Sequence, residues 1–196
     1  TALAAFARVA VRVGAGIALA GSCACRPAAR PADSVPTLAT ATLTHPIPSK
    51  SAVPQLTRIG DGQEMATWLE RRADKGFRFR AARRHGSTWA PTSTIDDSVD
   101  IAMFGADLPG VAPLPGGALL AYWERFDRSN GDPIATRIHL ARSDDGGQTW
   151  SALASPHRDG TAGQHSFMAT FPLDAGLGLT WLDAQKQQFH PAAHAD

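Results

Sequence analysis

A repeated pattern constrains the fold of this chain more than any other feature of its sequence. Each copy contains a short apolar stretch, a turn with Gly, a second apolar stretch, a Trp and then a carboxylate. The copies cover residues 54–70, 109–124 and 166–183. Their Trp residues, Trp68, Trp123 and Trp181, are 55 and 58 residues apart. Self-similarity at a fixed spacing indicates a repeat architecture, in which neighbouring units bury their apolar faces against each other.

Each copy opens a unit that is expected to contain four short strands. In the second unit we expect strands over residues 109–114, 118–125, 135–142 and 149–154. Residues 138–142 alternate apolar and polar side chains, which is typical of a half-buried strand. Asp-Gly at 61–62 and Pro-Gly-Gly at 115–117 favour tight hairpin turns. The sequence therefore predicts an all-β fold of antiparallel strands.

Composition narrows the classes of function. The chain has 19 basic and 18 acidic residues, so it carries no broad basic surface for nucleic acid, and we expect no nucleic-acid partner. Both cysteines precede residue 26, which leaves the remainder without a disulfide or a cysteine-based metal site. The seven His residues are scattered, and no Gly-rich phosphate loop precedes a helix. We therefore expect no metal and no cofactor.

The N-terminal segment has the features of an export signal. Arg8 and Arg12 precede the short apolar run 13–20, and small residues follow. The stretch 19–23 resembles a bacterial lipobox, although its Leu lies one place early, and the resemblance implies lipidation of Cys23. The alternative is an ordinary cleaved signal followed by incidental cysteines. Either alternative predicts an exported protein. With a lipid anchor in the membrane, the protein would belong to a bacterial cell envelope, in the periplasm or at the outer membrane.

Residues 1–25 are thus expected to be a signal and lipobox segment. Residues 26–53 are rich in Pro, Ala, Ser and Thr and have almost no aromatic side chains. That composition favours a flexible tether between the membrane and the folded part. At the other end, residues 184–196 form a polar tail without a pattern.

The segment 143–150 carries the most specific motif of the chain. It matches the pattern S-x-D-x-G-x-T-W at every specified position, through Ser143, Asp145, Gly147, Thr149 and Trp150. In physical terms, the Gly suits a turn with positive φ and the Asp side chain can accept hydrogen bonds from the amides of the turn. The segment resembles the Asp-box, or BNR, repeat of sialidases and related β-propellers. That resemblance implies a structural box, between the third and fourth strands of a blade, rather than a catalytic or metal-binding one.

The resemblance covers residues 54–183 and implies a β-propeller of four-stranded antiparallel blades. The expected blades span residues 54–95, 101–156 and, in part, 165–183. These amount to about two and a half blades of a six-bladed propeller, so the chain is expected to be truncated, or to need partner chains to close. The first blade keeps only the end of the box, Gly86 to Trp89, with Arg84 in place of the Asp.

Blade topology places the expected functional face at the ends of the strands away from the Asp box. The polar loops of that face are residues 70–76, 96–107, 124–133, 157–165 and those after 183. Arg158, Asp159 and His165 are the candidate catalytic residues, because they offer an acid, a base and a guanidinium group. The alternative is a solvated loop. Asp96, Asp97 and Asp100 form a second acidic patch, which we expect to be a solvated loop.

The resemblance implies an exo-α-sialidase-like glycoside hydrolase that acts on sialic-acid or similar glycans when full length. The arginine triad, Tyr–Glu pair and acidic residue of that family are not identifiable here. The first blade lacks the Arg-Ile-Pro motif, and the only tyrosine, Tyr122, falls inside an expected strand. Enzymatic activity therefore stays open. The alternatives are a non-catalytic glycan- or protein-binding propeller of the envelope, or a shortened product that is inactive by itself.

Overall fold

The computed structural model describes residues 42–183 except residues 61, 130 and 158–162. The expected signal segment with Cys23, residues 26–41 of the expected tether and the polar tail lie outside the described residues. The described part contains β-strands and one 3-10 turn, and no α-helix. It accordingly offers no helix of sufficient length and apolarity for a membrane crossing. All strand pairs in the described residues are antiparallel, which confirms the predicted all-β class.

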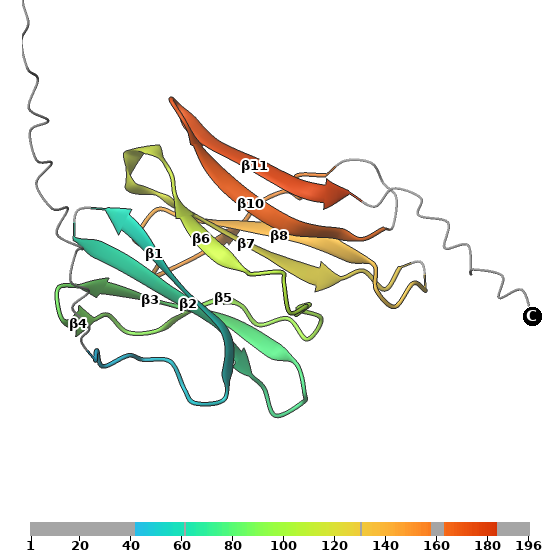
Figure 1. The fold of residues 1–196 in the computed structure, drawn as a ribbon, viewed down its shortest axis with the longest axis horizontal. Coiled ribbons are helices and arrows are strands. Elements are labelled where there is room, and N and C mark those ends of the chain that lie inside the picture. The colour runs from blue at the N-terminus through green and yellow to red at the C-terminus, as the bar shows by residue number, and fades with distance from the viewer. Residues whose placement is uncertain (1–41, 61, 130, 158–162, 184–196) are drawn as a thin grey trace, which may run out of the picture. The chain divides into compact units, whose positions relative to one another are not determined.

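The first sheet follows chain order (Figure 1). Its strands are β1 (Ser51–Gly60), β2 (Gln63–Arg71), β3 (Phe77–His85), β4 (Thr88–Trp89) and β5 (Ser93–Asp96). Both β4 and β5 pair with β3, so together they form an interrupted fourth strand. The interruption contains Pro91, which has no backbone N–H to donate to a ladder.

The second sheet repeats this order. Its strands are β6 (Gly110–Pro113), β7 (Leu119–Phe126), β8 (Thr136–Ser143) and β9 (Ser151–Ala152). A 3-10 turn, Pro115–Gly117, joins β6 to β7. Every strand of this sheet begins and ends within two residues of the range expected from the sequence. β9 is the shortest, because regular pairing with β8 covers only two residues.

A two-stranded hairpin completes the described residues. It consists of β10 (His165–Leu173) and β11 (Gly176–Asp183). Leu120, Ile138 and Leu140 of the second sheet form a core cluster, against which Met168 and Trp181 of the hairpin pack. The three units therefore succeed one another in space as they do in sequence (Figure 1).

The main core lies between the first and second sheets. Met65, Leu69 and Phe79 of the first sheet form one cluster with Leu119 and Trp123 of the second. The Phe79 and Trp123 rings lie 5.9 Å apart between centroids, in a tilted arrangement. Burial of large aromatic and aliphatic side chains is the principal stabilising contribution for such sheets.

The segment before β1 covers the other face of the first sheet. There Ala66, Trp68 and Ala82 form a small cluster, and Ile47 and Trp89 pack against it. The Trp89 indole N–H donates to the carbonyl of Thr44 at 2.7 Å. Residues 44–47 and the start of β1 at Ser51 thus belong to the folded part, although the sequence placed them in the tether.

Candidate functional site

The Asp-box loop joins β8 to β9 and is held together by one carboxylate. Asp145 accepts hydrogen bonds from the hydroxyls of Ser143 (2.8 Å) and Thr149 (2.6 Å). It also accepts the backbone N–H groups of Gln148 (2.9 Å) and Thr149 (3.0 Å). The Thr149 hydroxyl and amide, followed by the Ser143 hydroxyl, hold the pKa of Asp145 far below its usual range. The Asp145 carboxylate accepts all of these hydrogen bonds from the loop itself, so its role is to hold the turn in shape.

The same loop approaches the first sheet closely. Gly147 has a φ of 90°, and a Cβ atom there would lie 2.5 Å from Cε of Met65. Trp150 packs against the main core, and its indole N–H donates to Oγ of Ser93 at 3.3 Å. The Asp box therefore joins the two sheets as well as two strands.

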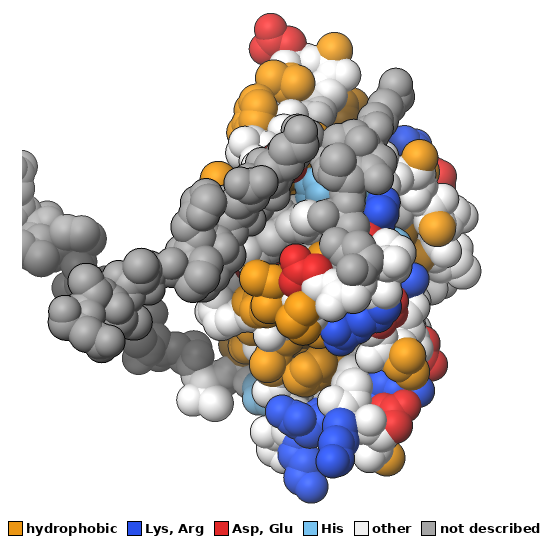
Figure 2. Space-filling model, turned by 90° about the vertical axis from the view of Figure 1, so that its right-hand side faces the viewer, with side chains coloured by type: hydrophobic (Ala, Val, Ile, Leu, Met, Phe, Trp, Pro, Cys, Tyr) orange, Lys and Arg blue, Asp and Glu red, His pale blue; other side chains and the backbone are white. Residues whose placement is uncertain are grey.

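At the opposite strand ends, arginines and carboxylates pair with each other. Arg78 donates from Nε to Asp97 at 2.8 Å, and Arg72 donates to both Asp97 and Asp74. The hydrogen bond from Arg78 lowers the pKa of Asp97. On the face drawn in Figure 2, Asp and Glu side chains lie beside many of the Lys and Arg side chains. Ion pairs of this exposed kind contribute little to stability.

Asp96 lies among these charges, but it is buried. Its carboxylate accepts the Trp123 indole N–H at 2.6 Å and two guanidinium bonds from Arg125, at 2.8 and 2.6 Å. Burial by itself would raise the pKa of Asp96, but the hydrogen bonds from Arg125 and Ser98 outweigh it and lower the pKa. The expectation of a solvated loop was wrong for Asp96, because its carboxylate is needed to bond β7 to the end of β5.

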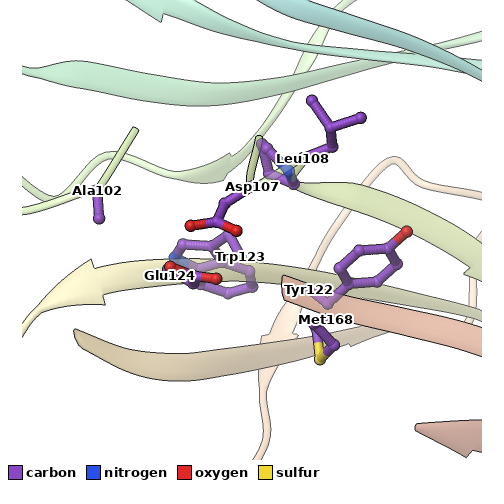
Figure 3. A pocket seen from close by; sticks show the side chains of 8 residues that line it. Ala102, Asp107, Leu108, Tyr122, Trp123, Glu124 and Met168 are labelled. Atoms are coloured by element: carbon purple, nitrogen blue, oxygen red, sulfur yellow. The ribbon is translucent and has the colours of Figure 1, made fainter. Parts of the chain in front are cut away.

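A small cavity next to this region contains two further carboxyl groups. Its lining residues are Ala102, Asp107, Leu108, Pro109, Tyr122, Trp123, Glu124 and Met168 (Figure 3). Asp107 and Glu124 are 7% exposed, and Figure 3 shows the Asp107 carboxyl group directed to the side of the cavity where Glu124 lies. The cavity volume is about 10 Å³, which is close to the least that one water molecule requires.

Burial controls the charge of this pair. It raises the pKa of Glu124 to about 8, and the neighbouring charge of Asp107 adds to the effect. Burial also raises the pKa of Asp107, against the hydrogen bond from the Phe167 amide. At neutral pH the pair therefore retains a proton on Glu124. One protonated and one charged carboxyl group can hold and transfer a proton, which is the requirement of acid–base chemistry.

The backbone of the hairpin is strained where it meets this pair. Phe167 has a φ of 55°, which is uncommon for a residue with a bulky side chain. In this conformation its amide donates to Oδ1 of Asp107 at 3.1 Å. Strained residues persist only where the surrounding structure determines them, and they occur frequently at functional sites.

Two buried histidines lie beside the start of β10. The His157 and His165 rings stack, with centroids 3.8 Å apart and an interplanar angle of 12°. Nδ1 of His165 is 3.0 Å from the carbonyl oxygen of Thr136, and its Nε2 is 3.5 Å from Asp183. Nε2 of His157 accepts the amide of Ile138 at 3.3 Å. These contacts give both rings a part in joining the hairpin to the second sheet.

The structure describes one of the three catalytic candidates chosen from the sequence. Arg158 and Asp159 lie outside the described residues. His165 is 1% exposed and is held between His157 and Thr136. No group of three or more His, Cys, Asp or Glu side chains suited to a metal ion occurs in the part of the chain that the structure describes.

Sequence reasoning missed Asp107 and Glu124. Glu124 closes the second copy of the repeated pattern and Asp107 ends the expected loop 96–107, but the two residues are 17 apart and neither was a candidate for catalysis. One signal was present, because Glu124 directly follows the apolar run 118–123 inside an expected buried strand. A carboxylate in such a position is rarely buried without a partner.

Neither a protein-family model nor a curated protein matches the chain. The site must therefore be interpreted from its own geometry.

Proposed function

We propose that the described residues are blades of an Asp-box β-propeller of the sialidase-like type, and that the full-length protein is an exported glycoside hydrolase of exo-α-sialidase type. The observation that carries this proposal is the Asp-box loop. Asp145 and its four hydrogen bonds occur in the turn between a third and a fourth strand, as the resemblance implies. The substrates would be sialic-acid or similar glycans.

The relation between successive units supports the propeller. The first strands of the two larger sheets, β1 and β6, contact each other, and each sheet then extends outward in chain order. The hairpin β10–β11 packs on the second sheet as the second packs on the first. A propeller repeats this relation radially until it closes. About two and a half blades of six would be present, so further blades or partner chains would close the ring.

Export is the second part of the proposal. Residues 1–25 would direct the chain to the envelope, and lipidation of Cys23 would anchor it there. Metabolic labelling with a radioactive fatty acid should mark the protein, and Cys23→Ser should abolish the label. A labelled Cys23→Ser variant would contradict the anchor.

A non-catalytic glycan- or protein-binding propeller is the alternative, and one observation favours it. Arg72, Arg78 and Arg125 at the expected functional end are engaged by carboxylates of the same chain, and Arg71 and Arg128 lie over the rings of Phe77 and Phe126. A substrate carboxylate would need a guanidinium group free to receive it.

Incubation of the full-length protein with a fluorogenic sialoside from pH 4 to 8 tests the enzyme proposal. We expect release of the fluorophore, and a loss of about 100-fold or more in kcat/KM for Asp159→Asn if it supplies acid–base catalysis. The exposed Asp144→Asn is the matched control and should keep its rate. Folded protein without any release would reject the hydrolase, and binding on a glycan array would then favour the alternative.

A further inference from the structure

The cavity beside β7 leaves two polar atoms unexplained. Oδ2 of Asp107 and Oε2 of Glu124 are buried and have no hydrogen-bond partner among the described residues. Each residue is 7% exposed. A buried carboxyl oxygen without a partner is costly, and two that face one cavity are more so because their charges repel. Something that the cavity can hold must reduce this cost.

Three segments of the chain meet at this point. The link 101–109 runs along β7, where the amide of Ala102 donates to the carbonyl of Glu124 at 2.9 Å. The link then turns back, with the Asp107 amide donating to Phe104 at 3.2 Å. From the third side, the Phe167 amide of β10 reaches Asp107 at 3.1 Å. The carboxyl pair therefore lies in the joint between the second sheet and the hairpin.

A metal ion does not suit this cavity. Calcium requires six to eight oxygen ligands, and magnesium requires six in a regular octahedron. Apart from the carboxyl pair and Tyr122, the lining side chains are Ala, Leu, Pro, Trp and Met. The volume of about 10 Å³ admits about one water molecule. A proton requires no ligand shell, and a water in the cavity can join the two carboxyl groups by hydrogen bonds.

Among the described residues, the charges near the pair are directed elsewhere. Glu124 of β7 is paired with Ile138 of β8. The charged or titratable side chains next to them along the two strands are those of Arg125, Arg137 and His139. Because side chains alternate along a strand, these three lie on the face of the sheet opposite to Glu124. Arg125 is paired with Asp96 and lies 3.9 Å from Asp100, and Arg137 is paired with Asp127.

The other described strands packed around the pair add no countercharge either. β6 carries no titratable side chain. Tyr122 is neutral, since burial raises its pKa. On β10 the titratable group is His165, whose ring contacts His157, Thr136 and Asp183.

We propose that Asp107 and Glu124 share one proton across a single water in this cavity, and that this acid pair holds the β10–β11 hairpin against the second sheet until the proton is lost. The pair is a proton-dependent joint. Its loosening would release the Phe167 amide from Asp107 and free the strand that begins with His165. The inference rests on the cavity and does not depend on a glycan-directed activity.

The direction of the pH dependence follows from Glu124. Its pKa is about 8 in the folded chain and 4.5 in its ordinary state. Below about 4.5 both folded and unfolded chains hold the proton, and its stabilising effect is complete. Between these values only the folded chain holds it, so stability falls as pH rises. Above about 8 both states have lost it, and two negative charges face each other in the joint.

Unfolding by urea between pH 5 and 9 tests the joint. We expect the unfolding equilibrium constant of the 196-residue chain to rise at least tenfold over this range, since one pKa unit corresponds to a factor of ten. Glu124→Gln keeps the shape without the charge and should remove most of this rise. Glu64→Gln is the matched control, because it makes the same chemical change in β2, where Glu64 pairs with Arg84. This variant should keep the rise of the unfolding equilibrium constant with pH. Equal slopes for the parent and Glu124→Gln would overturn the proposal.

Hydrogen exchange provides a local measurement. After correction for the intrinsic rates, the peptide 165–173 should lose protection above pH 8 in the parent but not in Glu124→Gln. The peptide 77–85 of β3 should remain unchanged in both. Loss of protection in both proteins alike would contradict the role of the pair. Stabilisation of the parent by millimolar calcium or magnesium at pH 8.5, absent in Glu124→Gln, would also overturn the shared proton by showing a cation site.

Discussion

The turns between the third and fourth strands of the two sheets occupy the same position but are built differently. In the first sheet His85 pairs with Thr88, so the turn consists of Gly86 and Ser87, with Gly86 at a φ of 57°. In the second sheet the last strand pair is Arg142 with Ser151, and the Asp-box loop lies between. A two-residue hairpin is held by its strands. The longer loop requires a hydrogen-bonding centre of its own, which Asp145 provides.

The Trp at the end of each turn follows a common rule. Trp150 packs on the first sheet and donates to Ser93. Trp89 packs with Ile47 and donates to the carbonyl of Thr44. In both units the indole contacts the segment that precedes its own sheet in the chain. The difference shows that this turn can form without the Asp, while the contact of its Trp with the preceding segment of the chain is present in both units.

Removal of the two Trp side chains should have unequal effects, and the loss at Trp150 should be the largest of all. Trp150→Ala should lower the free energy of unfolding by about 3 kcal/mol, because it opens a cavity against the main core. Trp89→Ala should cost less, about 1–2 kcal/mol, because its neighbour is the short segment 44–47. Urea denaturation of both variants measures the difference. A larger loss for Trp89→Ala would reverse the comparison.

Substitution of the glycines in the two turns should have the next largest effects on stability, and the two losses should differ. Gly147→Ala combines left-handed strain with crowding against Met65, and should cost about 2–3 kcal/mol. Gly86→Ala has strain alone, since no atom lies within 4 Å of the added Cβ, and should cost about 1 kcal/mol. Thermal unfolding compares the two. A smaller loss from Gly147→Ala in a Met65→Ala background than in the parent would identify the crowding, and equal losses at the two glycine positions would exclude it.

Substitution of Asp145 should cause the smallest loss of stability at neutral pH and should also change how stability depends on acid. Its pKa is far below the ordinary value, so the stability that it contributes is present above about pH 4 and is lost as pH falls further. Asp145→Asn should therefore be less stable than the parent at pH 7 but lose less stability on acidification. Acid unfolding curves test this, and Asp144→Asn should follow the parent. A parallel curve for Asp145→Asn would show that the loop does not depend on the charge.

The features that depend on neighbouring residues in the sequence were predictable. The strands of the second sheet lie within two residues of their expected ranges because the alternation of side chains and the Gly turns are local signals. The Asp box is local as well, since Ser143 to Trp150 contains both the carboxylate and all its donors.

The contacts between distant segments were not predictable from such signals. The Asp107–Glu124 pair depends on how the link 101–109 folds over β7, and no residue of the link specifies that path by itself. The packing of Ile47 on the first sheet was hidden by a composition typical of a tether. His157 and His165 were placed in the polar loop 157–165, with His165 as a catalytic candidate, but their burial as a stacked pair arises from the hairpin.

The direction of the Trp contacts has a consequence for synthesis on the ribosome. Trp89 contacts residues 44–47 and Trp150 contacts Ser93. Each indole therefore packs on a segment that left the ribosome before it. Domains fold from the N-terminus as the chain is made, at about 5–20 residues per second. Each unit can thus dock on the preceding segment before the next unit is made, and its remaining apolar face is covered when that next unit arrives. Vectorial growth of this kind shortens the time during which an apolar sheet face stays open to other nascent chains.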